Sequence, residues 1–118
     1  MKVAVVGVCA SGKTTLAQAL RQFGIEAVDV AQEHSDVPHM WQTITRPDAL
    51  IYLDASRETV RARSPIRNTV DFLDSQLRRL AHARAHADLI LCVDDLSPQQ
   101  VLARVLAKLE ELHDSPSP

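Results

Sequence analysis

Near its N-terminus the chain reads Gly7-Val8-Cys9-Ala10-Ser11-Gly12-Lys13-Thr14-Thr15. This spacing matches the phosphate-binding pattern G-x-x-x-x-G-K-[ST] without a gap. The two glycines let the backbone bend where a Cβ atom would clash. The resulting turn points successive N–H groups inward, and a helix that begins near Lys13 adds the positive end of its dipole. The stretch therefore predicts a loop that holds phosphate groups.

The pattern assigns roles to individual residues of the loop. Contacts with phosphates are expected from Gly7, Ala10, Ser11, Gly12, Lys13, Thr14 and Thr15. The Lys13 ammonium would reach the β- and γ-phosphates, which also makes Lys13 a candidate catalytic residue. The Thr14 hydroxyl would be a ligand of Mg²⁺. The cofactors that these roles imply are Mg²⁺ and ATP or a related nucleoside triphosphate.

The sequence on both sides of the loop provides the context that the pattern requires. Residues 1–6 form an apolar, β-branched run that is typical of a buried parallel strand. Leu16 and Leu20 recur at helical spacing, which predicts a helix over residues 13–23 that ends at Gly24. A strand, a glycine-containing loop and a helix thus follow one another as the motif demands.

The rest of the chain alternates between apolar strands and helical segments. Further strands are expected at residues 25–30, 49–54 and 89–93. Helices are expected at residues 39–45, 56–64 and 69–87, and from Pro98 onward after a capping box of Ser97 and Gln100. The helix at 69–87 is expected to bury Val70, Leu73, Leu77, Leu80, Ala81 and Ala87. The last helix is expected to bury Val101, Leu102, Val105, Leu106, Leu109 and Leu112.

This alternation indicates an α/β fold, with a small parallel sheet that is covered by helices on both faces. About four strands are expected, in the order 2-1-3-4, because right-handed crossovers limit the topology. The phosphate loop then lies where connections leave the first strand in opposite directions, which is the usual ligand crevice. Residues 1–113 are expected to form a single nucleotide-binding domain, followed by a disordered tail at residues 114–118.

Length and composition narrow the classes of function. With 118 residues, of which 46% are hydrophobic and 24% charged, the chain has the size and composition of one globular domain. A net charge of −2 without a basic run argues against nucleic acid as a partner. The sequence contains no apolar stretch of membrane-spanning length, and because the first strand is expected at its start, we expect no signal peptide. Two cysteines, one of them inside the loop, fit reduced thiols in the cytoplasm.

Three segments resemble the P-loop nucleoside and nucleotide kinases, the adenylate-kinase-like group of P-loop NTPases, in shortened form. The first segment is the phosphate loop. The second, residues 50–58, is similar to the strand that leads into the lid region, and Arg63-Ser64-Pro65-Ile66-Arg67 follows at the place of an R-x-x-x-R sequence. The third, residues 87–98, resembles the last strand and the turn whose backbone contacts adenine in that family.

The resemblance implies that Arg63 contacts the base and that Arg67 lies near the phosphates, where it would assist catalysis. The sequence also departs from the family. Residues 31–48 stand where these kinases have an acceptor-binding insertion, Gln32-Glu33-His34 stands where a D-R signature is expected, and the lid insertion after Arg67 is missing. The resemblance therefore implies nucleotide binding more directly than phosphoryl transfer to a small acceptor.

Three carboxylates follow strands at the expected ligand edge. Asp29 and Glu33 follow the second strand, where either could hold the water shell of a metal or act as a base; the alternative is a solvated loop acid. Asp54 ends the third strand as a Walker-B carboxylate does, and the alternative is a structural role as the cap of the next helix. Glu33 is thus a candidate catalytic residue, and Asp29 and Asp54 are candidate metal ligands.

Two further features have alternative interpretations. His82 and His86, spaced i, i+4, could bind a metal, but their basic neighbours and the lack of an evident third ligand favour a solvated face. Trp41 is either a lid over the crevice or a core anchor for its segment.

The sequence as a whole predicts a cytoplasmic protein that binds ATP or a related nucleotide with Mg²⁺. One hypothesis is a minimal kinase-like phosphotransferase with an unknown small-molecule acceptor, or a slow Mg²⁺-dependent NTPase. The alternative is a non-catalytic regulatory module. A homodimer that supplies the missing lid or arginines in trans is a third hypothesis.

Overall fold

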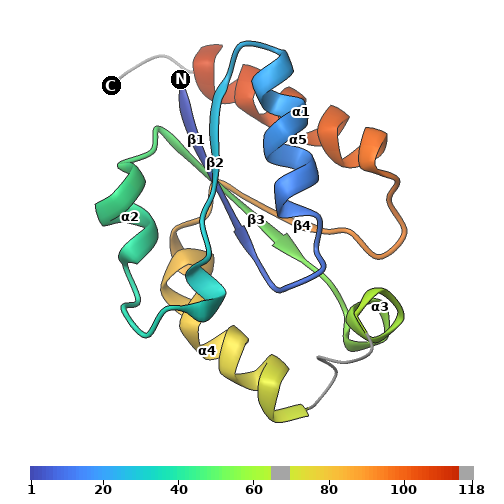
Figure 1. The fold of residues 1–118 in the computed structure, drawn as a ribbon. Coiled ribbons are helices and arrows are strands. Elements are labelled where there is room, and N and C mark those ends of the chain that lie inside the picture. Colours follow the sequence, from blue (N-terminus) through green and yellow to red (C-terminus); the bar gives the residue numbers. More distant parts are fainter. Residues whose placement is uncertain (65–69, 115–118) are drawn as a thin grey trace.

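The computed structural model describes residues 1–64 and 70–114 (Figure 1). Within these residues the elements are β1 Lys2–Gly7, α1 Lys13–Gln22, β2 Glu26–Asp29, the 3₁₀ turn η1 Gln32–His34, α2 Met40–Thr45, β3 Ala49–Asp54, α3 Arg57–Arg63, α4 Val70–His86, β4 Leu89–Cys92 and α5 Pro98–Asp114. The strands and helices expected from the sequence are present, with small differences at their ends. The candidate Arg67 and residues 115–118 of the expected tail lie outside the described residues, whereas Asp114, which was expected in the tail, is the last residue of α5.

The strands of the described residues form one parallel sheet in the order β2-β1-β3-β4. In β1, one of the two central strands, Val5 is paired with Asp29 on one side and with Ile51 on the other. Residues 3–7 of β1 and 49–53 of β3 are buried, which explains why both strands are continuously apolar. The α/β class and the strand order expected from the sequence are confirmed.

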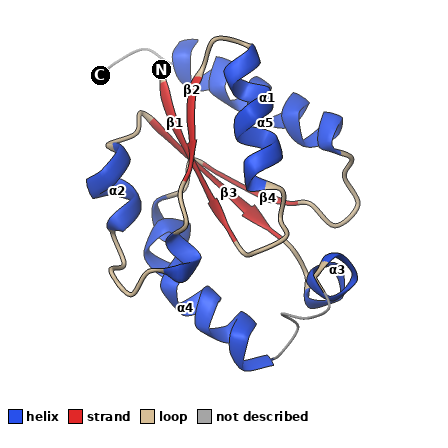
Figure 2. Cartoon of the chain, in the orientation of Figure 1, coloured by secondary structure: helices blue, strands red, loops and turns tan. Residues whose placement is uncertain are grey.

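Helices cover both faces of the sheet (Figure 2). The pair α1 and α5 lies on one face, and α4 lies with η1 and α2 on the other. The expected face of α5 is buried or half-buried, at Val101, Leu102, Val105, Leu106, Leu109 and Leu112. Its expected capping box is also present: Ser97 N–H donates to Gln100 Oε1 at 2.8 Å, and Gln100 N–H donates to Ser97 Oγ at 3.1 Å.

The buried face of α4 differs from the expected one. The residues that face the core are Leu73, Gln76, Leu80 and Ala83. Leu77 is 40% exposed and Ala81 is exposed, so their assignment to the buried stripe is wrong. Successive helical residues point roughly 100° apart around the axis, and the inward position of Gln76 therefore turns Leu77 away from the core. A pattern that counts only apolar residues could not find a buried glutamine.

Trp41 anchors the segment between β2 and β3. Its side chain is 5% exposed, which favours the core anchor over a lid. The Trp41 backbone N–H donates to Gln32 Oε1 at 2.9 Å, and its indole Nε1–H donates to His82 Nδ1 at 3.2 Å. The His82 ring stacks on His86, with ring centroids 4.3 Å apart. The expectation of a solvated face is therefore wrong for His82, which is half-buried and bonded to Trp41.

Acidification is expected to weaken this anchor. Burial, followed by the neighbouring His86 and His39, lowers the pKa of His82 from its usual value of 6.5. As the pH falls below 6.5, the unfolded chain therefore takes up a proton at this position before the folded chain does. His82 thus makes the folded state less stable in acid than at neutral pH. Protonation of Nδ1 would also remove the acceptor of the Trp41 indole.

The measurement is thermal unfolding between about pH 7.5 and pH 5, followed by the fluorescence of Trp41, the sole tryptophan of the chain. A His82→Gln variant lacks the titrating ring, so its stability should fall less on acidification than that of the wild type. The other histidines are common to both proteins. Equal losses of stability in the two would contradict the role assigned to His82.

Candidate functional site: a phosphate loop beside a cavity

The loop between β1 and α1 has a backbone suited to binding an anion. Gly7, Ala10 and Gly12 have positive φ angles of 154°, 63° and 95°. α1 begins at Lys13 without a side-chain cap, so the N–H groups of its first turn have no acceptor within the helix. These groups and the positive end of the α1 dipole suit phosphate oxygens.

Lys13 is held by the loop and by a carboxylate from η1. Its Nζ donates to the carbonyls of Gly7 at 3.1 Å and Val8 at 3.2 Å, and to Glu33 Oε2 at 2.5 Å. A lysine ammonium has three donors, and all three are used here. The Lys13 and Glu33 side chains are 12% and 4% exposed, so Glu33 is not the solvated loop acid of the alternative interpretation. Its second oxygen, Oε1, is buried without a partner among the described residues.

A second carboxylate lies beside the threonine of the loop. The Thr14 hydroxyl donates to Asp29 Oδ2 at 2.9 Å, and Arg21 is 3.5 Å from Asp29 Oδ1. A hydroxyl and a carboxylate supply the oxygen ligands that Mg²⁺ prefers. Within the described residues no group of three histidine, cysteine or acidic side chains could hold a metal. The pair fits a Mg²⁺ ion that takes its remaining ligands from phosphates and water.

Asp54 is engaged elsewhere. Its Oδ2 pairs with Arg84 of α4 at 3.1 Å, and its Oδ1 accepts the N–H of Ala55 at 3.0 Å. The cap of α3 is Ser56, whose Oγ accepts the N–H of Thr59. Asp54 is thus neither bonded to Thr14 nor the cap of α3. Its ion pair with Arg84 links β3 to α4.

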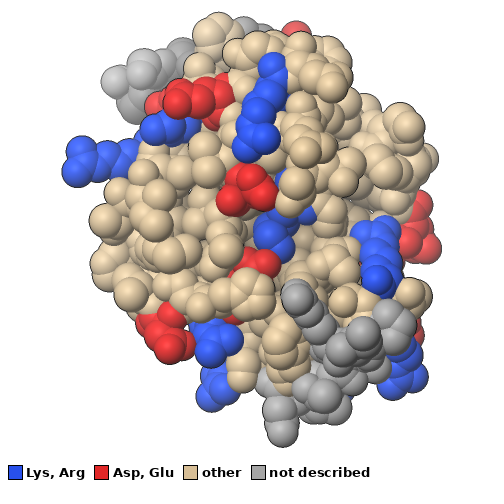
Figure 3. Space-filling model, viewed as in Figure 1, with Lys and Arg blue, Asp and Glu red and all other residues tan. Residues whose placement is uncertain are grey.

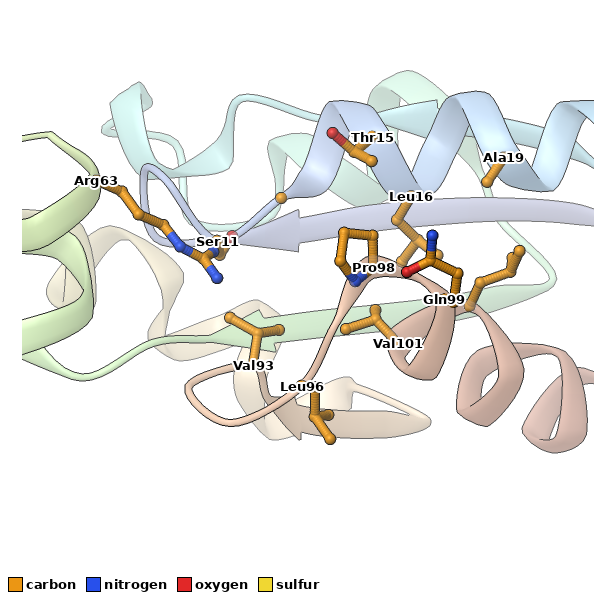
Figure 4. Close-up of a pocket in the computed structure, with 12 residues that line it drawn as sticks. Ser11, Thr15, Leu16, Ala19, Arg63, Val93, Leu96, Pro98, Gln99 and Val101 are labelled. Atoms are coloured by element: carbon orange, nitrogen blue, oxygen red, sulfur yellow. The ribbon is translucent and has the colours of Figure 1, made fainter.

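A cavity of about 330 Å³ adjoins the loop on the side of α1 and α5 (Figure 4). Ser11 and Arg63 line its end at the loop, and most of the other side chains that line it, such as Val93 and Leu96, are apolar. The Arg63 Nη1 donates to the carbonyl of Ala10 at 2.9 Å. Arg63 therefore lies between the loop and the cavity. The turn within residues 87–98 lies at the other end of the cavity.

Two features of the loop were not predicted from the sequence. Ala10 has a left-handed backbone, which costs a non-glycine residue roughly 1–2 kcal/mol, and such strain gathers at ligand sites. Gln76 of α4 accepts the N–H of Cys9 at 2.9 Å through its Oε1. The N–H of Cys9, which is not among the expected phosphate contacts, is thus already used by Gln76.

The surface of the protein carries mixed charge. On the face of the molecule that Figure 3 shows, basic and acidic side chains of the described residues are interspersed. No helix of the described part of the chain is both long and apolar enough to cross a membrane.

No protein-family model and no curated protein sequence matches the chain. Among solved structures, the chain is similar to the YorR protein from Bacillus subtilis, whose crystal structure is a complex with phosphorylated GDP. The TM-score is 0.68, and the alignment covers 99% of this chain and 100% of that chain at 12% sequence identity. At so low an identity the similarity establishes a shared fold alone.

Proposed function

We propose that the loop at residues 7–15 binds the phosphates of ATP or a related nucleoside triphosphate together with Mg²⁺. The observation that carries the proposal is a convergence at one sheet edge of the free N–H groups of α1, the Lys13 ammonium and the Thr14–Asp29 pair. The phosphorylated GDP in the structure of YorR, whose fold is similar, supports a nucleotide as the ligand.

The cavity beside Arg63 suits the base of this nucleotide. Its volume of about 330 Å³ is at the lower end of the roughly 300–1,000 Å³ that small-molecule sites occupy. Its apolar lining would cover the faces of a purine, and the Arg63 guanidinium could stack on the ring. With the base there, the phosphates would follow the loop from Ala10 toward Lys13.

Thr14 and Asp29 would hold the metal in this arrangement. Mg²⁺ usually binds through one or two protein oxygens together with phosphates and water, which matches the pair. When bound, the ion would neutralise charge on the phosphates and polarise the phosphoryl group.

Glu33 suits the role of general base in phosphoryl transfer. The acceptor, a small-molecule hydroxyl or water, would give its proton to Glu33 Oε1 while its oxygen bonds to the γ-phosphorus. The bond from the γ-phosphorus to the bridging oxygen would break, and that oxygen would leave on the nucleoside diphosphate. Because all three Lys13 donors are in use, phosphate binding would draw Lys13 away from Glu33 and free the carboxylate.

Glu33→Gln is expected to separate binding from turnover. The variant loses the base, and kcat should fall by about a hundredfold or more. The affinity for the triphosphate should rise severalfold, because a neutral amide competes less well for Lys13 and no longer repels the phosphates. Phosphate release and transfer, measured with and without candidate acceptors, and calorimetric titration of the nucleotide test both parts.

A matched control is Asp36→Asn. This carboxylate is exposed and pairs with Arg79 at 3.0 Å, so its loss removes a nearby negative charge without touching Lys13. Wild-type turnover in Glu33→Gln would exclude Glu33 as the base. Tight nucleotide binding without turnover in the wild-type protein, at several protein concentrations, would instead favour the regulatory module.

A further inference from the structure

A glutamine amide of α4 is buried against the phosphate loop with part of its hydrogen-bonding capacity unused. Gln76 is fully buried, and its Oε1 accepts the N–H of Cys9 at 2.9 Å. This bond fixes the orientation of the amide, because the atom that faces an N–H donor must be the oxygen. The Nε2 of Gln76 is buried without a partner among the described residues. Buried donors without acceptors are costly and rare, so one beside a ligand loop points to a missing partner.

The packing of α4 places this amide near the Lys13 end of the loop. Arg79, three residues after Gln76 on the same helix face, donates from Nη1 to the carbonyl of Glu33 at 3.4 Å. The Glu33 side chain in turn pairs with Lys13 at 2.5 Å. Gln76 is not among the residues that line the cavity beside Arg63, and α4 lies across the sheet from α1 and α5 (Figure 2).

A single peptide group links Gln76 to Lys13. The carbonyl of Val8 accepts from Lys13 Nζ at 3.2 Å, and the N–H of the same peptide, which belongs to Cys9, donates to Gln76. Because the peptide is planar, the bond to Gln76 also fixes the direction of the carbonyl that holds Lys13. The glutamine thus contacts the part of the loop that positions the lysine.

We propose that Gln76 Nε2 contacts the terminal phosphate of the bound triphosphate, an inference that rests on the proposed function. A nucleotide with its base beside Arg63 and its phosphates along the loop brings the last phosphate to the Lys13–Glu33 side, where Gln76 lies. An oxygen of this phosphate accepts from Nε2 and satisfies the buried donor. A diphosphate ends before this point and leaves Nε2 unpaired. Gln76 therefore favours the triphosphate over the diphosphate.

The test is the ratio of affinities for ATP and ADP, and for GTP and GDP, measured by calorimetric titration with Mg²⁺ at one salt concentration. Gln76→Leu is expected to reduce the preference for the triphosphate by about tenfold. A role confined to anchoring Cys9 predicts another result: both nucleotides would bind more weakly and the ratio would stay the same. Gln76→Glu keeps an acceptor for the N–H of Cys9 but has no amide donor, so it should also lose the preference for the triphosphate.

The control variant is Leu80→Ala. Leu80 is buried one turn further along the same face of α4 and has no polar atom, so its truncation should lower stability without changing the ratio. A wild-type ratio in Gln76→Leu or Gln76→Glu, in a protein that binds both nucleotides, would refute only the contact by Gln76. A wild-type protein that binds neither nucleotide would refute the proposed function, and this inference with it.

Discussion

Replacement of Lys13 by alanine is expected to weaken the binding of Mg²⁺-ATP by about tenfold to a hundredfold. The ammonium would donate charge-assisted hydrogen bonds to the phosphates, which are worth about 1.5–3 kcal/mol, and about 1.4 kcal/mol corresponds to a factor of ten. Calorimetric titration measures the loss directly. Unchanged affinity in a folded variant would remove the basis for placing phosphates on this loop.

The structure adds a second consequence of this substitution. Lys13 is the ion-pair partner of Glu33, whose side chain is 4% exposed. Removing one partner of a buried pair typically destabilises a protein by about 3–5 kcal/mol, because the other charge stays buried and uncompensated. Lys13→Ala alone should therefore lower both the affinity and the melting temperature.

The double variant Lys13→Ala, Glu33→Gln separates the two effects. The neutral amide removes the buried charge, so the melting temperature should recover most of the loss. The affinity for ATP should stay well below that of Glu33→Gln alone, since the cationic donor is still missing. Recovery of the affinity together with the stability would mean that Lys13 serves the fold and not the phosphates.

The fold followed from the sequence because its signals are local. Parallel strands that are buried on both faces have continuous apolar sequences, such as residues 49–54. Between these strands lie segments whose apolar residues recur at the spacing of a helix. The spacing of Gly7, Gly12 and Lys13 marks the loop because the backbone turn is made within a few residues. Strand order then follows from crossover handedness together with the position of the loop.

The partners of the loop could not be predicted in this way. The bond between Lys13 and Glu33 crosses 20 residues, and the bond between Cys9 and Gln76 crosses 67. Such contacts depend on the rotation of α4 and on the path of η1, which no local pattern specifies. The sequence named Glu33 and Asp29 because they follow a strand, but it left open which loop residue each would meet.

Gly7→Ala is expected to destabilise the folded protein. A Cβ atom at this position would overlap the backbone carbonyl of Leu53, with which Gly7 is paired across β1 and β3. A strand carbonyl in the middle of the sheet cannot move away as a flexible side chain could. Overpacking of this kind costs about 1–3 kcal/mol, and the φ of +154° adds backbone strain of roughly 1–2 kcal/mol. The melting temperature should fall by about 10 °C or more.

The other two glycines of the chain provide matched controls. Gly12 and Gly24 also have positive φ angles, of 95° and 78°, but a Cβ atom at either position would meet nothing within 4 Å. Alanine at either position should therefore cost only the roughly 1–2 kcal/mol of backbone strain. Gly12→Ala should also weaken nucleotide binding because it distorts the loop, whereas Gly24→Ala, at the far end of α1, should not. Equal destabilisation by all three substitutions would show that backbone strain alone, and not the approach of β1 to the Leu53 carbonyl, requires glycine at position 7.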